Sequence, residues 1–152
     1  MPEAISTRGL TKHYGRRRVV DSLDLRVPEG SVYGLLGRNG SGRSTTMKAI
    51  LGLVGRRTGS VMVNGNEVTA MAPHKIARLG IGLVPEGRQL FPSLSIRENL
   101  DVLARAGASA GKPWTLARAL DLFPRLNEML DRPAWQTSGG EQQMVAIARA
   151  LM

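Results

Sequence analysis

The most informative segment of the sequence is Gly37-Arg38-Asn39-Gly40-Ser41-Gly42-Arg43-Ser44-Thr45. It follows the apolar run Ser31–Leu36 and precedes the helix-forming run Thr46–Leu51, which predicts the order strand, glycine-rich turn, helix. Glycines let the backbone turn its amide hydrogens inward, and the next helix directs its positive dipole end to the same place. The stretch therefore predicts a phosphate-binding loop. The glycines expected at positive φ are Gly37, Gly40 and Gly42.

Two side chains of this loop carry its expected chemistry. The Ser44 hydroxyl stands where it would reach a magnesium ion that bridges two phosphates. The usual pattern, G-x-x-x-x-G-K-[ST], has lysine where this chain has Arg43. Arginine keeps the charge but is wider and planar, so we expect weaker phosphate binding and a larger loss of any catalysis. For this stretch alone, an ordinary strand-to-helix loop is the alternative.

Composition bounds the class of protein. The chain has 152 residues, of which 42% are hydrophobic, and this suits one domain with a core. It has no run of eighteen or more apolar residues, and its start, Met1–Ala4, lacks the features of a signal peptide. We therefore expect a soluble chain in the cytoplasm.

The numbers of cysteines and histidines and the net charge limit which metal sites and binding partners are expected. With no cysteine and only His13 and His74, disulfides, thiolate sites and a histidine-based zinc centre are not expected, so a metal would arrive with its ligand. The net charge of +9 is compatible with nucleic acid, an acidic membrane surface or anionic ligands. Aromatic residues make up only 4%, and no helix-turn-helix or RNA-binding motif is present. A nucleic-acid partner is therefore not expected.

Periodicity and turn signals give the order of elements. Strands are expected at Ile5–Leu10, Leu23–Val27, Ser31–Leu36, Thr58–Val63, Glu67–Thr69 and Ile81–Val84, with a hairpin on Asn64-Gly65-Asn66. Helices are expected at Pro73–Leu79, from Ser95 to about Ala106, at Thr115–Leu130 with an interruption at Pro124, and after Ser138. Ser95 and Glu98 have the spacing of a capping box at the start of the second of these, and a loop is expected at Gly107–Pro113. In the last helix, one apolar face is expected to hold Met144, Ile147, Ala148 and Leu151.

This order predicts an α/β fold of the P-loop NTPase type with an antiparallel β layer and a helical lobe. Residues 1–85 and 137–152 are expected to form the nucleotide-binding core. Residues 86–136 have lost all strand signals and are expected to form the lobe. Together they are read as one domain over 1–152.

A second motif, Ser138-Gly139-Gly140-Glu141-Gln142, lies at the start of the last helix. Its serine hydroxyl and glycine amides are a possible anion site, and a simple helix N-cap is the alternative. Together with the glycine-rich loop, it resembles the LSGGQ-like signature of the ATP-binding subunits of ABC transporters. Thr137 stands where leucine or methionine is usual.

The resemblance implies cofactors, partners and further site residues. ATP and magnesium would be bound, and the signature would face the γ-phosphate held by a second ATP-binding subunit in a head-to-tail dimer. Tyr14 falls where the family stacks an aromatic ring on adenine, although a half-buried turn tyrosine is the alternative. Glu86 falls at the Q-loop position, where glutamine is usual. Transmembrane permease subunits and a peripheral place on the inner face of a bacterial membrane are implied too.

Three stretches are similar to the members that serve branched-chain amino acid uptake: Val84–Arg88, Phe91-Pro92 and Ile96–Leu100. The segment Leu10–Gly15 is nearer to exporter-type members. The resemblance therefore implies a role in membrane transport, with amino-acid uptake as the expected direction.

The family's next elements carry the Walker B aspartate, the catalytic glutamate, the D-loop and a switch histidine. No such residues follow Met152, and no earlier acidic pair after an apolar strand replaces them. We therefore expect the chain as given to lack the C-terminal part of the core, to hydrolyse ATP poorly and to be prone to aggregation. Whether it is an enzyme by itself stays open; the alternative is a non-catalytic nucleotide-binding or regulatory fragment.

Overall fold

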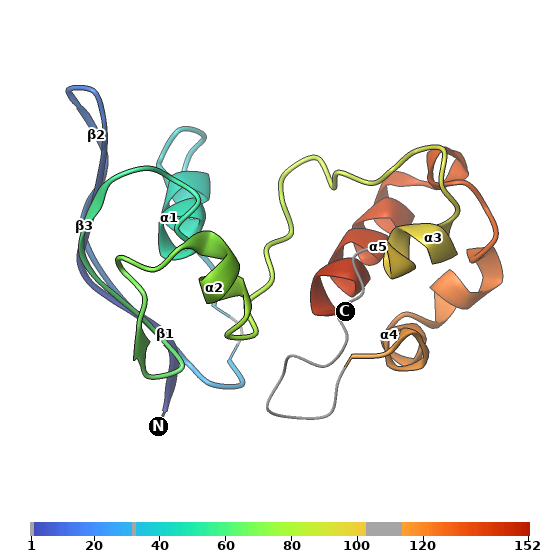
Figure 1. Ribbon diagram of the computed structural model, residues 1–152. Coiled ribbons are helices and arrows are strands. Elements are labelled where there is room, and N and C mark those ends of the chain that lie inside the picture. The colour runs from blue at the N-terminus through green and yellow to red at the C-terminus, as the bar shows by residue number, and fades with distance from the viewer. Residues whose placement is uncertain (1, 32, 103–113) are drawn as a thin grey trace. The chain divides into compact units, whose positions relative to one another are not determined.

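The computed structural model describes residues 2–31, 33–102 and 114–152 (Figure 1). The chain divides into two compact units, Met1–Leu79 and Gly80–Met152. Each unit has its own set of buried apolar side chains and is described by itself.

The first unit is built on a four-stranded antiparallel sheet with the order β2-β1-β3-β4. Its strands are β1 (Glu3–Tyr14), β2 (Arg17–Pro28), β3 (Arg57–Val63) and β4 (Asn66–Glu67). The predicted antiparallel layer is present, and β1 and β2 are longer than the sequence pattern indicated. Asn64 and Gly65 both have positive φ between β3 and β4, which is the two-residue hairpin turn predicted from the Asn-Gly pair.

Two helices complete this unit, α1 (Arg43–Ile50) and α2 (Pro73–Ala77). Proline at the first position of α2 fits the helix start, because its missing amide hydrogen has no partner there in any case. Burying apolar side chains from both strands and helices stabilises the unit. The fully or almost fully buried ones are Leu10, Val20, Leu25, Ala49, Ile50, Leu51, Val61, Val63, Val68 and Ile76.

Two predicted strands are not strands in the described structure. Residues 31 and 33–36 form no ladder, and the Leu36 side chain is 95% exposed. Residues 81–84 are also irregular rather than a buried strand. An apolar run indicates burial, but a strand also needs a neighbour to accept its hydrogen bonds, and neither run has one in the described part of the chain.

Within its described residues, the second unit begins with an irregular segment and then has helices joined by turns, with a single bridge between Ser95 and Pro133 as its only β pairing. Its helices are α3 (Ile96–Asp101), α4 (Leu116–Leu122), the 3-10 helices Pro124–Met129 and Ala134–Gln136, and α5 (Gly139–Leu151). The predicted interruption at Pro124 is confirmed. The predicted continuation of α3 to about residue 106 and the loop 107–113 fall largely outside the described residues.

Reciprocal capping fixes where two of these helices start. Ser95 accepts from the Glu98 amide and the Glu98 carboxylate accepts from the Ser95 amide, so the capping box predicted for α3 is confirmed. Ser138 and Glu141 form the same arrangement at α5. No helix in the described part of the chain is long and apolar enough to cross a membrane.

The core of the second unit gathers around α3 and α5. The predicted apolar face of α5 is partly wrong, because Val145, Ala146 and Ala148 are its buried residues, while Ile147 and Leu151 are only half-buried. The buried cluster is Ile96, Leu100, Ala119, Leu126, Met129, Leu130, Ala134, Val145 and Ala148.

Candidate nucleotide-binding site

The loop before α1 has the backbone that a phosphate-binding turn requires. Gly40 and Gly42 have φ of 82° and 89°, as predicted, and Gly42 is the residue directly before α1. The Ser41 amide donates to the Arg38 carbonyl at 3.0 Å, which closes the turn, and the Thr46 amide donates to the Gly42 carbonyl at 2.8 Å. The left-handed glycines therefore bring the turn directly to the N-terminus of the helix.

Gly37 differs from the prediction, because its φ is not positive among the described residues. A Cβ placed on Gly37 would lie 2.5 Å from the Ser41 Oγ. Glycine therefore suits this position because a side chain has no room there, and not because of its φ angle. At Gly42 both reasons apply, since a Cβ there would lie 2.5 Å from the Val19 carbonyl oxygen of β2.

The charged and hydroxyl side chains of the loop stand at the first turn of α1. Arg43 is exposed, and its Nη2 donates to Asn39 Oδ1 at 3.4 Å. Ser44 is exposed and Thr45 is half-buried in the same turn. The first turn of α1 holds no acidic residue, so its positive dipole end is not neutralised by the helix itself. This arrangement suits an anionic group.

A metal site made by protein side chains is not found in the described part of the chain, where no three His, Asp or Glu residues gather. The expected contribution of the Ser44 hydroxyl to a magnesium ion that arrives with its nucleotide stays a prediction. It fits the hydroxyl's place in the first turn of the helix that follows the loop.

Tyr14 ends β1 with half of its side chain exposed. The Lys12 Nζ lies 4.9 Å from the centre of its ring, and the same ammonium donates to the Arg56 carbonyl at 3.0 Å. Lys12 is buried, so it supports the ring from the protein side. The ring is exposed, and its stacking on a base stays a prediction.

Ser138 is seen as a helix N-cap. Its Oγ accepts from the Glu141 amide at 3.3 Å, and Glu141 Oε2 accepts from the Ser138 amide at 2.7 Å. Hydrogen bonds lower the pKa of the Glu141 carboxyl. The bond from the Ser138 amide has the largest effect, and those from the Ser138 hydroxyl and from Arg125 have smaller effects. Gly139 and Gly140 are exposed in the first turn. The role of the motif as an anion site stays a prediction.

Gln142 joins three segments of the second unit. Its Nε2 donates to the carbonyls of Ala134 and Thr137, both at 3.2 Å. Its Oε1 accepts from Arg88 Nη1 at 3.1 Å. The same guanidinium lies against Gly139, where an added Cβ would be 3.1 Å from Arg88 Nη2. The signature and the segment after Glu86 are therefore in direct contact.

Sequence reasoning missed two arginines that hold this segment. Beyond the contacts of Arg88, Arg149 Nη2 donates to the Gln89 carbonyl at 2.8 Å and to the Arg88 carbonyl at 3.2 Å. Burial lowers the pKa of Arg149. An arginine among the small and apolar residues of Ala146–Leu151 was the available signal, because such a side chain needs buried acceptors. Glu86 itself is exposed.

Comparison with known proteins agrees with these observations. A family model described as ABC transporter matches residues 20–152. The probable branched-chain amino acid transport ATP-binding protein LivF of Archaeoglobus fulgidus is 35% identical over 148 residues, covering 97% of this chain and 63% of the relative. The high-affinity branched-chain amino acid transport ATP-binding protein BraG of Pseudomonas aeruginosa is 36% identical over 146 residues, covering 94% and 61%.

An export protein is similar to this chain as well. The Nod factor export ATP-binding protein I of Burkholderia lata is 38% identical over 154 residues, covering 100% of this chain and 50% of the relative. The chain thus spans between half and two thirds of the length of these curated relatives.

Solved structures confirm the predicted fold class. An ATP-binding subunit of an ABC transporter matches with a TM-score of 0.78 and 29% identity, over 97% of this chain and 61% of that one. A bacterial ABC transporter cassette solved as a dimer matches with a TM-score of 0.74 and 29% identity, over 97% and 68%. The chain therefore belongs to the ABC transporter family of ATP-binding domains.

Proposed function

We propose that the chain serves as the ATP-binding subunit of an ABC transporter and binds ATP with magnesium at residues 37–45. The start of α1 carries this proposal. Gly40 and Gly42 are left-handed, and the helix that follows begins without an acidic residue in its first turn. A turn of inward amides at the positive end of a helix stabilises phosphate oxygens.

Each side chain of the site has a proposed role. The Tyr14 ring stacks on adenine, the amides of residues 38–45 bind phosphate oxygens, and Arg43 adds positive charge at the terminal phosphates. The Ser44 hydroxyl contributes to holding magnesium, which neutralises phosphate charge when it is bound. Glu86 takes the Q-loop position.

The partners of the proposed subunit follow from the family. The signature residues Ser138–Gln142 contact the γ-phosphate held by a second ATP-binding subunit in a head-to-tail dimer, and Ser138, Gly139 and Gly140 are exposed at the start of α5. Transmembrane permease subunits bind the cassette at the inner face of a bacterial membrane. A similar cassette has been solved as a dimer, which supports the pairing.

Uptake of branched-chain amino acids is the proposed transport process. LivF and BraG, which support it, are named for branched-chain amino acid transport. The Nod factor export protein is similar over a comparable stretch, so export is the second candidate. Uptake of labelled leucine by cells that lack this gene separates the two: loss of uptake supports the first candidate, and unchanged uptake contradicts it.

Residues 1–152 by themselves are proposed to bind ATP weakly and to hydrolyse it little. Arg43 replaces the lysine of the usual pattern, and no acidic pair after an apolar strand is found in these residues. Hydrolysis depends on placing water and neutralising charge. The alternative is a non-catalytic regulatory fragment. Turnover clearly above that of a Ser44→Ala variant would contradict the proposed deficiency.

The nucleotide site is tested by equilibrium binding of fluorescent ATP in the presence of magnesium. We expect Arg43→Lys to strengthen binding, by roughly 3- to 10-fold, because an ammonium fits between phosphate oxygens where the guanidinium is too wide. Ser44→Ala should weaken magnesium-dependent binding. Folded protein that binds no ATP, either unaltered or as Arg43→Lys, would overturn the proposal.

A further inference from the structure

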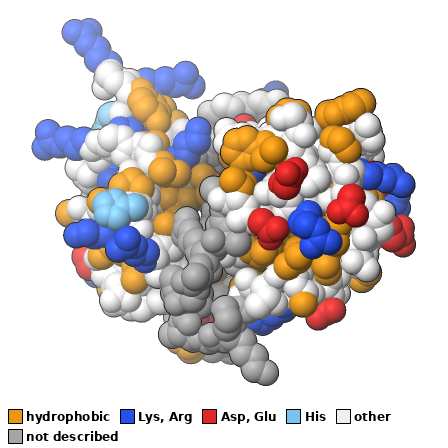
Figure 2. Space-filling view, turned by 45° about the vertical axis from the view of Figure 1, so that its right-hand side comes forward, with side chains coloured by type: hydrophobic (Ala, Val, Ile, Leu, Met, Phe, Trp, Pro, Cys, Tyr) orange, Lys and Arg blue, Asp and Glu red, His pale blue; other side chains and the backbone are white. Residues whose placement is uncertain are grey.

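Three consecutive arginines, Arg16, Arg17 and Arg18, lie where β1 and β2 meet at the hairpin turn. Basic side chains project from this end of the unit (Figure 2). All three arginines are exposed. Among the described residues only Arg18 of the three has an ion pair. The charges of Arg16 and Arg17 are therefore available to a ligand.

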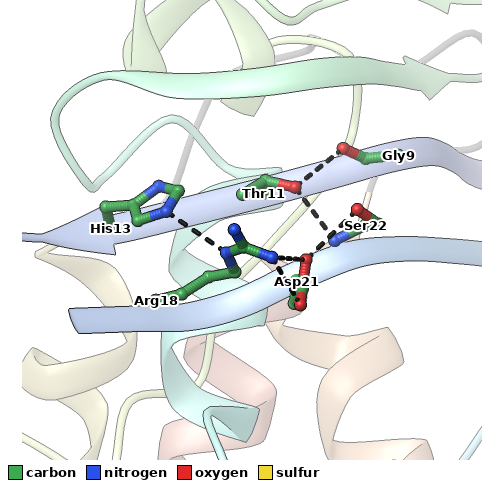
Figure 3. A network of polar contacts seen from close by, with 6 residues as sticks. All are labelled: Gly9, Thr11, His13, Arg18, Asp21 and Ser22. Atoms are coloured by element: carbon green, nitrogen blue, oxygen red, sulfur yellow. Dashed lines mark hydrogen bonds and ion pairs between the residues drawn. The ribbon is translucent and has the colours of Figure 1, made fainter. Parts of the chain in front are cut away.

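Arg18 is held on one face of the hairpin (Figure 3). Its Nη1 lies 2.8 Å from both carboxylate oxygens of Asp21, and its Nε donates to His13 Nε2 at 3.3 Å. The hydrogen bond from Arg18 is the main cause that lowers the pKa of Asp21. Arg18 therefore has its partners on this face and belongs to the hairpin's own polar network.

Strand register places Arg17 on the opposite face. Arg17 lies opposite Tyr14 in the antiparallel pair, one step beyond the pair of His13 and Arg18. Residues directly opposite each other share a face, and neighbours along a strand alternate. Lys12 contacts the Tyr14 ring, which confirms that this face holds Lys12, Tyr14 and Arg17. The Cα atoms of such opposite residues are about 5 Å apart.

Two contacts connect this part of the hairpin with the segments on either side of α1. Lys12 Nζ on this face donates to the carbonyl of Arg56, a few residues after α1. Val19 is an extra residue in the register, and its carbonyl lies against Gly42 so closely that a Cβ there would be 2.5 Å away. Arg17 is two residues from Val19, about 6.6 Å along the strand.

We propose that Arg17 is a nucleotide-binding residue that contacts the α-phosphate end of a nucleotide whose base stacks on Tyr14. This inference rests on the proposed ATP site. Tyr14 marks the base end and Gly42 the phosphate end. Arg17 lies opposite Tyr14 and is two residues from Val19, whose carbonyl lies against Gly42. A guanidinium can donate two hydrogen bonds to phosphate oxygens, and Arg17 has no competing carboxylate among the described residues.

Single substitutions at the three arginines test the proposal, since all are exposed and differ in face and contacts. Binding of ATP, ADP and adenosine is measured for Arg16→Ala, Arg17→Ala, Arg17→Lys and Arg18→Ala. We expect Arg17→Ala to weaken ATP and ADP by similar factors, roughly 5- to 20-fold, since both carry the α-phosphate. The affinity of Arg17→Ala for adenosine should change less than 2-fold. Arg16→Ala should change the affinity for every ligand less than 2-fold. Arg17→Lys should keep part of the affinity for ATP and ADP that Arg17→Ala loses.

The outcomes separate this inference from the site on which it rests. ATP binding that Arg17→Ala leaves unchanged, while Ser44→Ala weakens it, overturns the role of Arg17 alone. Equal losses of ATP affinity in Arg16→Ala, Arg17→Ala and Arg18→Ala overturn it too, because they would indicate a general attraction to positive charge rather than a specific contact. An equal loss for adenosine overturns the phosphate contact. No ATP binding by the folded, unaltered chain overturns the proposed site and this assignment with it.

Discussion

Glu67, on the short edge strand β4, is a carboxylate whose charge depends strongly on its neighbours. Its carboxylate accepts from Ser60 Oγ at 2.6 Å, from Thr69 Oγ1, and from the amides of Thr69 and Val61 at 3.2 and 3.4 Å. These bonds, led by that from Ser60, lower the pKa of Glu67 from 4.5 to about 2. The ionised form therefore stabilises the folded first unit.

The pH dependence of stability follows from this shift. Because the folded-state pKa is the lower one, the stabilisation is complete above pH 4.5 and is lost as pH falls toward about 2. We expect roughly 1 kcal/mol to be lost over this window, allowing for the exposure of the side chain. The free energy of unfolding is measured by urea unfolding, followed by far-UV circular dichroism, as pH falls from 4.5 toward about 2. Its loss should be smaller for Glu67→Gln than for Glu29→Gln, since Glu29 is an exposed glutamate of the same unit and its variant keeps Glu67. Equal losses would contradict the assignment.

Gly42 has both a left-handed backbone and no room for a side chain, whereas Gly40 has only the first constraint. Alanine at either position adds about 1–2 kcal/mol of backbone strain. Only at Gly42 does a Cβ also meet the Val19 carbonyl, so we expect Gly42→Ala to lower the free energy of unfolding by at least about 1 kcal/mol more than Gly40→Ala. Equal costs in urea unfolding would show that the contact of the loop with β2 is not tight.

At the scale of elements, the contact of α5 with the segment after Glu86 is the least expected feature. Gly87, Arg88 and Gln89 have φ of 82°, 62° and 48°, and for the last two a left-handed backbone is unfavourable. Arg149 donates to the carbonyls of both. It also lies over the Phe91 ring at 5.9 Å. The helix therefore holds a strained segment in place.

Two substitutions in this contact should change stability in opposite directions. Arg149→Ala removes the donor to two carbonyls, and we expect a loss of about 1–3 kcal/mol in the free energy of unfolding.

Gln89→Gly relieves left-handed strain at an exposed side chain, and we expect a gain of about 0.5–1 kcal/mol in the free energy of unfolding. Tryptophan fluorescence during urea unfolding reports on this unit, because both tryptophans, Trp114 and Trp135, belong to it. A stability loss with Gln89→Gly would contradict the strain.

Elements with local signals could be predicted from the sequence. The Asn64-Gly65 turn and the capping box of Ser95 are examples, because each depends on residues within three positions of one another. The strands expected at 31–36 and 81–84 could not be judged this way, since an apolar run does not reveal whether a neighbouring strand will pair with it. Propensity describes the segment, and pairing depends on the rest of the chain.

Some features of the candidate site could likewise be predicted from local spacing, whereas others depend on contacts with distant segments. Glycine spacing predicted the loop before α1, and the left-handed Gly40 and Gly42 follow from it. The pairing of Arg17 with Tyr14 depends on the extra residue Val19 in the β1–β2 register, which no local pattern reveals. For Arg149 the sequence indicates a need for buried acceptors, but it does not reveal that the carbonyls of Arg88 and Gln89 supply them.

At the scale of the whole molecule, the two proposed nucleotide contacts lie in different units. The phosphate-binding loop is in Met1–Leu79, and the signature is in Gly80–Met152. In the proposed head-to-tail dimer, the signature of one copy contacts the nucleotide bound by the other. A single copy should therefore respond to ATP at the phosphate-binding loop and not at the signature.

Hydrogen exchange at two protein concentrations tests this whole-molecule prediction. In dilute protein, ATP with magnesium should slow the exchange of amides at 40–46 and leave the start of α5 unchanged, while concentrated protein should show slower exchange at both. Ser138→Asp is the matched control, because aspartate also caps a helix but puts negative charge where a phosphate would lie. It should remove only the concentration-dependent effect at α5. Slower exchange at α5 that is independent of dilution would contradict a signature that acts on a second copy.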